Sequence, residues 1–98
     1  MTIRVTQADT EKGGRGLGNN PLSRAVRRTT GQKWAVVGGR VACRLTRPRC
    51  IRLLPYGVTV RWKTYRCLGL MQPFEFELDV PATDSTRQKH KVEVVQQL

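Results

Sequence analysis

Three arginines fall close together on one predicted helix, and their chemistry suits the binding of phosphate. Arg24, Arg27 and Arg28 lie on the same side of a helix that turns by about 100° per residue. A guanidinium group is permanently charged and donates paired hydrogen bonds that match phosphate or carboxylate oxygens. The spacing therefore predicts a phosphate-binding face. The alternative is an ordinary solvated helix surface.

The helix that would carry these arginines has clear signals at both ends. Asn20 is a favoured capping residue, Pro21 suits the first helical position, and Gly31 can end the helix in a left-handed conformation. The apolar side would consist of Leu22, Ala25, Val26 and Thr29. We predict a helix over residues 21–30 that turns this side to the core and its arginines to solvent. Replacing the arginines would then spare the core.

The charge of the chain is strongly positive and unevenly distributed. Its 98 residues include 18 Lys or Arg and 7 Asp or Glu, for a formal net charge of +11. Residues 12–73 contain 14 of these basic residues and no acidic residue. Such a block projects a positive field, which predicts nucleic acid or an acidic protein surface as the partner. A membrane partner is not expected, because no apolar run approaches about 20 residues.

A second basic segment, residues 55–68, is compatible with a helix or a strand. We predict a helix, because Pro55 suits a helix start and Gly69 a helix stop. Basic residues here alternate with Trp62 and Tyr65, which could stack on bases or could anchor the core. The complete set of predicted nucleic-acid contacts is Arg24, Arg27, Arg28, Arg40, Arg44, Arg47, Arg49, Arg61, Lys63 and Arg66.

An acidic strand is predicted over residues 73–80, PFEFELDV. Its core face would consist of Phe74, Phe76, Leu78 and Val80. Its other face would carry Glu75, Glu77 and Asp79. These acids would either form cross-strand pairs with arginines or form a stripe that a protein partner recognises.

Catalytic and metal chemistry are not expected. Cys43, Cys50 and Cys67 form no C-x-x-C pair, and the single histidine, His90, lies far along a polar segment. This set lacks the ligands and spacing of a zinc site, and no nucleophile has a plausible base. We expect three reduced thiols, no cofactor and no enzymatic activity.

The predicted fold is α+β, a small, mainly antiparallel sheet with one or two helices packed on one face. Strands are expected at residues 2–6, 34–37, 40–45, 50–54 and 73–80, and helices at 7–12, 21–30 and 55–68. The Gly-rich loop at 13–20 lacks the G-K-[ST] of a phosphate-cradling loop. Residues 1–83 would form one basic domain. Residues 84–98 would form a polar tail, in which 92–95 could add a last strand.

Several segments together resemble a family of small, functionally uncharacterised phage and prophage proteins. The resemblance rests on IRVTQADTEKG, NPLSRAVRRTTG, WAVVGGRV and LP leading into PFEFELDV, which span most of residues 3–80. Members of that family carry cysteines before the first helix, where this chain has GLGNN, so no role of those cysteines transfers. The resemblance implies a phage accessory protein in the bacterial host cytoplasm and supplies no mechanism.

Two functions follow as expectations. The first is nucleic-acid binding, to DNA or RNA, through the arginine-rich face. The alternative is a phage-encoded inhibitor that docks on an acidic surface of a host nucleoprotein complex, as anti-CRISPR or transcription-directed proteins do. Steep salt dependence is typical of the first, whereas a packed apolar centre is typical of the second. The oligomeric state is left open.

Overall fold

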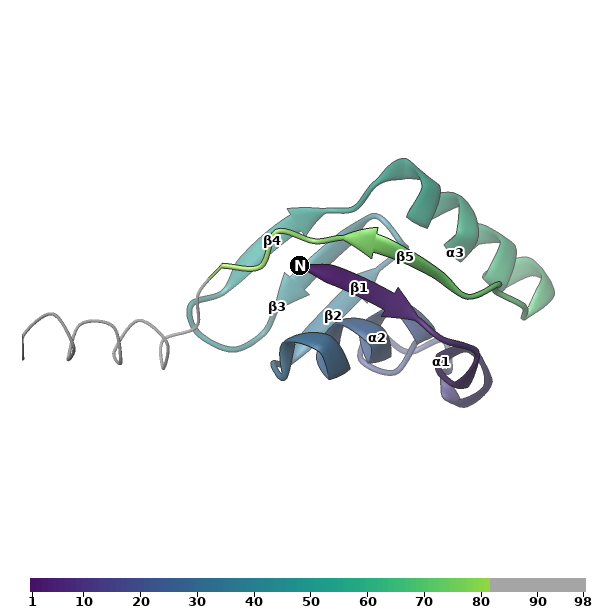
Figure 1. The fold of residues 1–98 in the computed structure, drawn as a ribbon, viewed down its shortest axis with the longest axis horizontal. Coiled ribbons are helices and arrows are strands. Elements are labelled where there is room, and N and C mark those ends of the chain that lie inside the picture. Colours follow the sequence, from purple (N-terminus) through teal and green to yellow (C-terminus); the bar gives the residue numbers. More distant parts are fainter. Residues whose placement is uncertain (82–98) are drawn as a thin grey trace, which may run out of the picture.

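The computed structural model describes residues 1–81, which form two antiparallel sheets and three helices (Figure 1). The order is β1 (Thr2–Val5), α1 (Gln7–Lys12), α2 (Pro21–Thr30), β2 (Trp34–Val37), β3 (Val41–Arg44), β4 (Cys50–Leu53), α3 (Tyr56–Leu68) and β5 (Phe74–Glu77). The predicted α+β class is confirmed. The tail predicted at 84–98, with its possible strand at 92–95, lies outside the described residues.

The strands divide between two sheets. β1 pairs with β5, so that Ile3 lies opposite Phe76, although the two are far apart in sequence. β2, β3 and β4 form a separate sheet in chain order, with Ala42 of β3 between Val36 and Arg52. The core lies between the sheets and contains Ile3, Val5, Leu22, Ala25, Val26, Trp34, Val36, Ala42 and Phe76.

Helix α2 has the predicted bounds and caps. The Asn20 side chain accepts a hydrogen bond from the Ser23 backbone N–H, and Gly31 ends the helix with φ 70°. Leu22, Ala25 and Val26 are buried as predicted, but Thr29 is exposed and Ser23 is buried in its place. The buried side of α2 therefore includes a hydroxyl group, which hydrogen bonds with the β2 backbone.

Residues 56–68 form helix α3, which resolves the ambiguity in the sequence. Trp62 and Tyr65 are only 6% exposed, and their ring centroids are 5.6 Å apart. The Tyr65 hydroxyl donates to the backbone carbonyl of Gly13. Both rings are therefore core anchors, and neither can stack on a nucleic-acid base. No helix within residues 1–81 has the length and apolarity needed to cross a membrane.

Candidate anion-binding site

The three arginines of α2 line one pocket of about 370 Å³. The other lining residues are Asp9 of α1 and Gly18 and Asn19 of the preceding loop. Helix periodicity brings the arginines to one side, and the fold then places α1 and the loop against that side. The pocket thus contains three guanidinium groups and one carboxylate.

One of these arginines helps to hold α2 against the outer edge of β2. Arg27 Nε donates to the Trp34 carbonyl at 2.7 Å. Nearby, the Asn20 amide donates to the Val36 carbonyl at 3.1 Å, and the Val36 N–H donates to the Ser23 hydroxyl at 2.9 Å. These side chains take the backbone groups that another strand would use. The outer edge of β2 is therefore closed to a further strand.

A second arginine binds a buried carboxylate. Asp9 is 1% exposed, and Arg28 donates to both of its oxygens, at 2.9 Å from Nη2 to Oδ2. The same Nη2 also donates to the Arg4 carbonyl at 2.7 Å. Asp9 completes the capping box of α1 by accepting the Thr6 N–H. Arg28 therefore links α2 to α1 and to the end of β1.

These contacts correct the prediction that the triad faces solvent and can be removed without affecting the core. Arg27 and Arg28 both make hydrogen bonds that hold secondary structure elements together. Helix periodicity correctly predicted that the three arginines lie on the same side of α2. It could not indicate that β2 and α1 would lie against that side.

Unused hydrogen-bond donors remain at the pocket on the other two arginines. Arg24 Nε is buried and has no partner among residues 1–81, and Arg24 Nη1 is 3.5 Å from Asn19 Oδ1, too far for a strong bond. Arg27 uses Nε, while its terminal nitrogens lie over Gly18. A Cβ at Gly18 would be 2.8 Å from Arg27 Nη2. Since Arg28 already neutralises Asp9, the pocket has the charge and the donors to bind an anion.

Acid is expected to destabilise the protein through Asp9. Burial opposes ionisation of this carboxyl, but hydrogen bonds from Arg28 and Thr6 outweigh burial and lower the pKa of Asp9 below 3.8. A carboxyl whose pKa is lower in the folded state than in the unfolded state stabilises the protein fully at pH values above its unfolded-state pKa. This stabilisation is lost as the pH falls through its folded-state pKa. Urea unfolding between about pH 7 and pH 2 should therefore show a loss that begins below about pH 4.

The control for this pH dependence is Asp9→Asn, which lacks the titrating charge. We expect this variant to lower the free energy of unfolding by about 2 kcal/mol at neutral pH, because its hydrogen bonds to Arg28 are weaker. Its stability should also fall less steeply between about pH 4 and pH 2, the range that we call the acid limb. The hydroxyl of Thr2 lowers the pKa of Glu77, so part of the limb should remain. An Asp9→Asn protein with the same acid limb as the wild type would contradict the assignment.

The other predicted nucleic-acid contacts do not form one face. Arg44 is only 1% exposed, and it donates to the carbonyls of Pro48 and Pro81 at 2.8 and 3.0 Å. The prediction that Arg44 contacts nucleic acid is therefore wrong. The exposed members are Arg40, Arg47, Arg49, Arg61, Lys63 and Arg66. They lie on α3, on the β2–β3 turn and on the β3–β4 turn, which is at the opposite end of the sheet from α3 (Figure 1).

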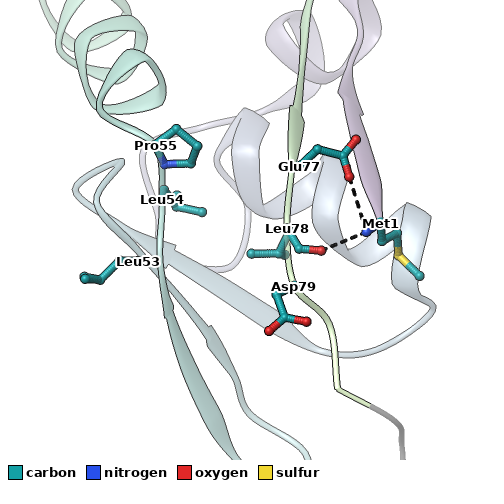
Figure 2. Close-up of a pocket in the computed structure, with 7 residues that line it drawn as sticks. All are labelled: Met1, Leu53, Leu54, Pro55, Glu77, Leu78 and Asp79. Carbon is teal, nitrogen blue, oxygen red and sulfur yellow. Dashed lines mark hydrogen bonds and ion pairs between the residues drawn. The ribbon is translucent and has the colours of Figure 1, made fainter.

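The predicted acidic stripe is exposed, and each of its carboxylates is close to a cation. Glu75 binds Arg4 on the paired strand at 2.8 Å, which confirms a cross-strand pair. Glu77 is 3.4 Å from the N-terminal amine, and Asp79 is 3.6 Å from Arg52. Figure 2 shows the first of these two contacts beside a groove of about 650 Å³ between β4 and β5.

The thiols are separated by the fold. Cys43 and Cys50 are half-buried on adjacent strands, and Cys67 is exposed on α3. Cys43 lies opposite Ile51, whereas Cys50 lies opposite Arg44, so the first two side chains point to opposite faces of the sheet. Among residues 1–81, no three His, Cys, Asp or Glu side chains lie together as metal ligands would.

Comparison with protein families, curated proteins and solved structures finds no match for this chain. Its function is therefore inferred from the geometry of the described residues.

Proposed function

We propose that this protein binds nucleic acid through its phosphate backbone, with the α2 pocket as the principal contact. The pocket itself carries this proposal, because three arginines and only one acidic residue line it. Arg28 satisfies that carboxylate, while Arg24 and Arg27 keep unused donors. A phosphodiester is singly charged and presents two free oxygens, which suits two guanidinium groups.

The positive charge of the described surface as a whole favours a polyanion over a single small anion. The exposed cations Lys12, Arg15, Lys33, Arg40, Arg61, Lys63 and Arg66 spread positive charge over several elements. Residues 12–73 supply no acid to oppose it. With Trp62 and Tyr65 buried, Tyr56 at the start of α3 is the one strongly exposed aromatic ring among residues 1–81, so binding rests mainly on phosphate contacts. Such contacts fix position without reading sequence, and we expect weak sequence preference.

The test replaces Arg24, which holds no other element in place. We expect Arg24→Ala to weaken binding of a labelled duplex DNA about 5- to 10-fold at ~0.1 M salt, because a charge-assisted hydrogen bond to phosphate is removed. The slope of log affinity against log salt should fall by about 0.9 for each phosphate that the variant no longer neutralises on duplex DNA. Fluorescence anisotropy over a salt series measures both quantities. An equivalent RNA duplex in parallel distinguishes DNA from RNA.

Two variants serve as controls for this test. Lys33→Ala removes one positive charge outside the pocket and should change affinity much less than Arg24→Ala. Arg24→Lys keeps the charge but lacks the planar pair of donors, so it should give an intermediate affinity with the wild-type salt slope. If Arg24→Ala matches Lys33→Ala, the pocket does not bind the phosphate backbone. If the wild type binds neither duplex at low salt, nucleic-acid binding itself is refuted.

A second function, docking on a protein of a host nucleoprotein complex, is favoured by a separate observation. Ile51 and Leu53 of β4 are 66% and 83% exposed, and phosphate binding makes no use of them. The resemblance to phage accessory proteins would place either function in the cytoplasm of a bacterial host.

A further inference from the structure

The three-stranded sheet has two very different faces. The register places Trp34, Val36, Ala42 and Arg44 on the inner face, where all four are buried. Alternation then places Ala35, Val37, Val41, Cys43, Ile51 and Leu53 on the outer face. We name these six residues the outer sheet face. It contains no charged or hydroxyl side chain.

The outer sheet face is partly open, most of all along β4. The core residues of β1, β5 and α2 pack on the inner face, and Figure 1 shows these elements in front of the fainter β2 and β3. Val37, Ile51 and Leu53 are 44%, 66% and 83% exposed. In Figure 2, Leu53 points away from β5, whereas its neighbour Leu54 points toward Leu78. Single exposed leucines are ordinary, but a contiguous apolar face typically marks an interaction site.

The ends of this sheet are basic. Lys33 precedes β2, and its carbonyl accepts a hydrogen bond from the Leu45 N–H, so it lies beside the end of β3. Arg47 and Arg49 lie in the β3–β4 turn, and Arg40 lies in the turn at the other end of the sheet. All four basic residues are exposed, and residues 12–73 contain no Asp or Glu. The two ends of the apolar face are therefore basic. Along the β4 edge, Glu77 and Asp79 line the groove beside Leu53, where they lie near the N-terminal amine and Arg52 respectively.

Size and charge argue against a second copy of this chain. Three strands about 4.8 Å apart and four residues long cover only about 200 Å², whereas a stable interface buries about 800 Å² on each partner. The basic residues around the apolar face would have to supply the remaining buried area. In a second copy, they would meet another set of basic residues and repel it.

Nucleic acid also fits this face poorly. Sheets that bind single-stranded nucleic acid present aromatic rings on which bases stack. The outer sheet face carries only aliphatic and thiol side chains. Bases would gain little there, and phosphates would have to lie on apolar side chains.

We propose that the outer sheet face docks a protein surface with an apolar centre and an acidic rim. Ile51 and Leu53 pack on the apolar centre, and Arg40, Arg47 and Arg49 pair with the surrounding carboxylates. This rests on the second proposed function, docking on a protein, and specifies the chemistry of the partner surface; it uses residues outside the α2 pocket. The protein would then connect a phosphate backbone to an acidic protein.

The probe for the test is a library of random peptides displayed on phage, selected against the whole protein with excess duplex DNA present. Selected peptides should have a Leu, Ile or Phe centre flanked by Asp or Glu. A synthetic peptide of the selected sequence should bind Leu53→Asp at least about tenfold more weakly, because this change removes apolar packing and repels acids. It should also bind Arg47→Ala/Arg49→Ala more weakly, with a smaller salt dependence.

Leu68→Asp is the matched control, because Leu68 is also highly exposed, at 68%, but lies on α3. It should bind the peptide as the wild type does, and thermal melts should show both Asp variants folded. Peptides without acids, or equal binding to both Asp variants, would overturn the proposal. So would a dimer in sedimentation that Leu53→Asp dissociates, or DNA affinity that falls much more with Leu53→Asp than with Leu68→Asp, which adds the same charge. Failure of Arg24→Ala to weaken DNA binding bears on the pocket alone.

Discussion

Gly39→Ala is expected to lower the free energy of unfolding by about 3–5 kcal/mol, from backbone strain and overpacking together. Gly39 has φ 66°, which costs about 1–2 kcal/mol for a residue with a Cβ. The added Cβ would also lie 2.7 Å from Trp62 Cγ and closer still to Trp62 Cβ. Trp62 is 6% exposed and belongs to the core, so it cannot move aside without disturbing the packing, at a further cost of about 1–3 kcal/mol.

The neighbouring glycine provides the control for this prediction. Gly38 has φ 61°, but a Cβ there would meet no atom within 4 Å. Gly38→Ala should therefore show the backbone cost alone, about 1–2 kcal/mol. Urea unfolding of both variants measures the difference, and the melting temperature of Gly39→Ala should fall by about 15 °C or more. Equal destabilisation by the two variants would mean that the turn does not pack against α3 as described.

Arg44→Ala is expected to destabilise the protein by about 3–5 kcal/mol, through unpaired acceptors and a cavity. Arg44 is 1% exposed and donates to the Pro48 and Pro81 carbonyls, which lie on the β3–β4 turn and after β5. Truncation would remove these bonds, at about 1–3 kcal/mol for each buried acceptor left unpaired, and would leave a cavity. For a small domain this approaches the whole stability.

Two variants separate the causes of this destabilisation. Arg44→Met refills the volume but donates no hydrogen bond, so it should recover part of the stability. Arg49→Ala removes the same charge from an exposed position, and its stability should stay within about 0.5 kcal/mol of the wild type. Chemical denaturation measures all three variants. If Arg44→Ala unfolds at the wild-type midpoint, Arg44 does not hold the two segments together.

The candidate site was only partly predictable from the sequence. Helix periodicity correctly placed Arg24, Arg27 and Arg28 on one side of α2. The pattern could not show that Arg28 would bind Asp9 or that Arg27 would bind the Trp34 carbonyl. It also gave no sign that Arg44 is buried, because alternating polar and apolar residues favour burial of the apolar side.

Elements with local causes could be predicted from the order of the amino acids. The cap at Asn20, the left-handed stop at Gly31, the Thr6–Asp9 capping box and the glycine turn after β2 all depend on residues a few positions apart. Hydrogen bonds and φ preferences of adjacent residues fix these features, so the pattern is sufficient to predict them.

Burial of particular faces and pairing of particular charges emerged only when distant segments came together. Pairing of β1 with β5 brings together residues such as Arg4 and Glu75, which are 71 positions apart in the chain. Packing of α2 on β2 likewise joins Asn20 and Ser23 to the backbone of Val36. Arg44 is buried on the inner face of β3, where the carbonyl of Pro48 in the adjoining turn and that of the distant Pro81 accept its hydrogen bonds. Leu53 of β4 is left outside. Such partners meet only through folding, since the free energy of a buried charge or an exposed leucine depends on what lies across from it.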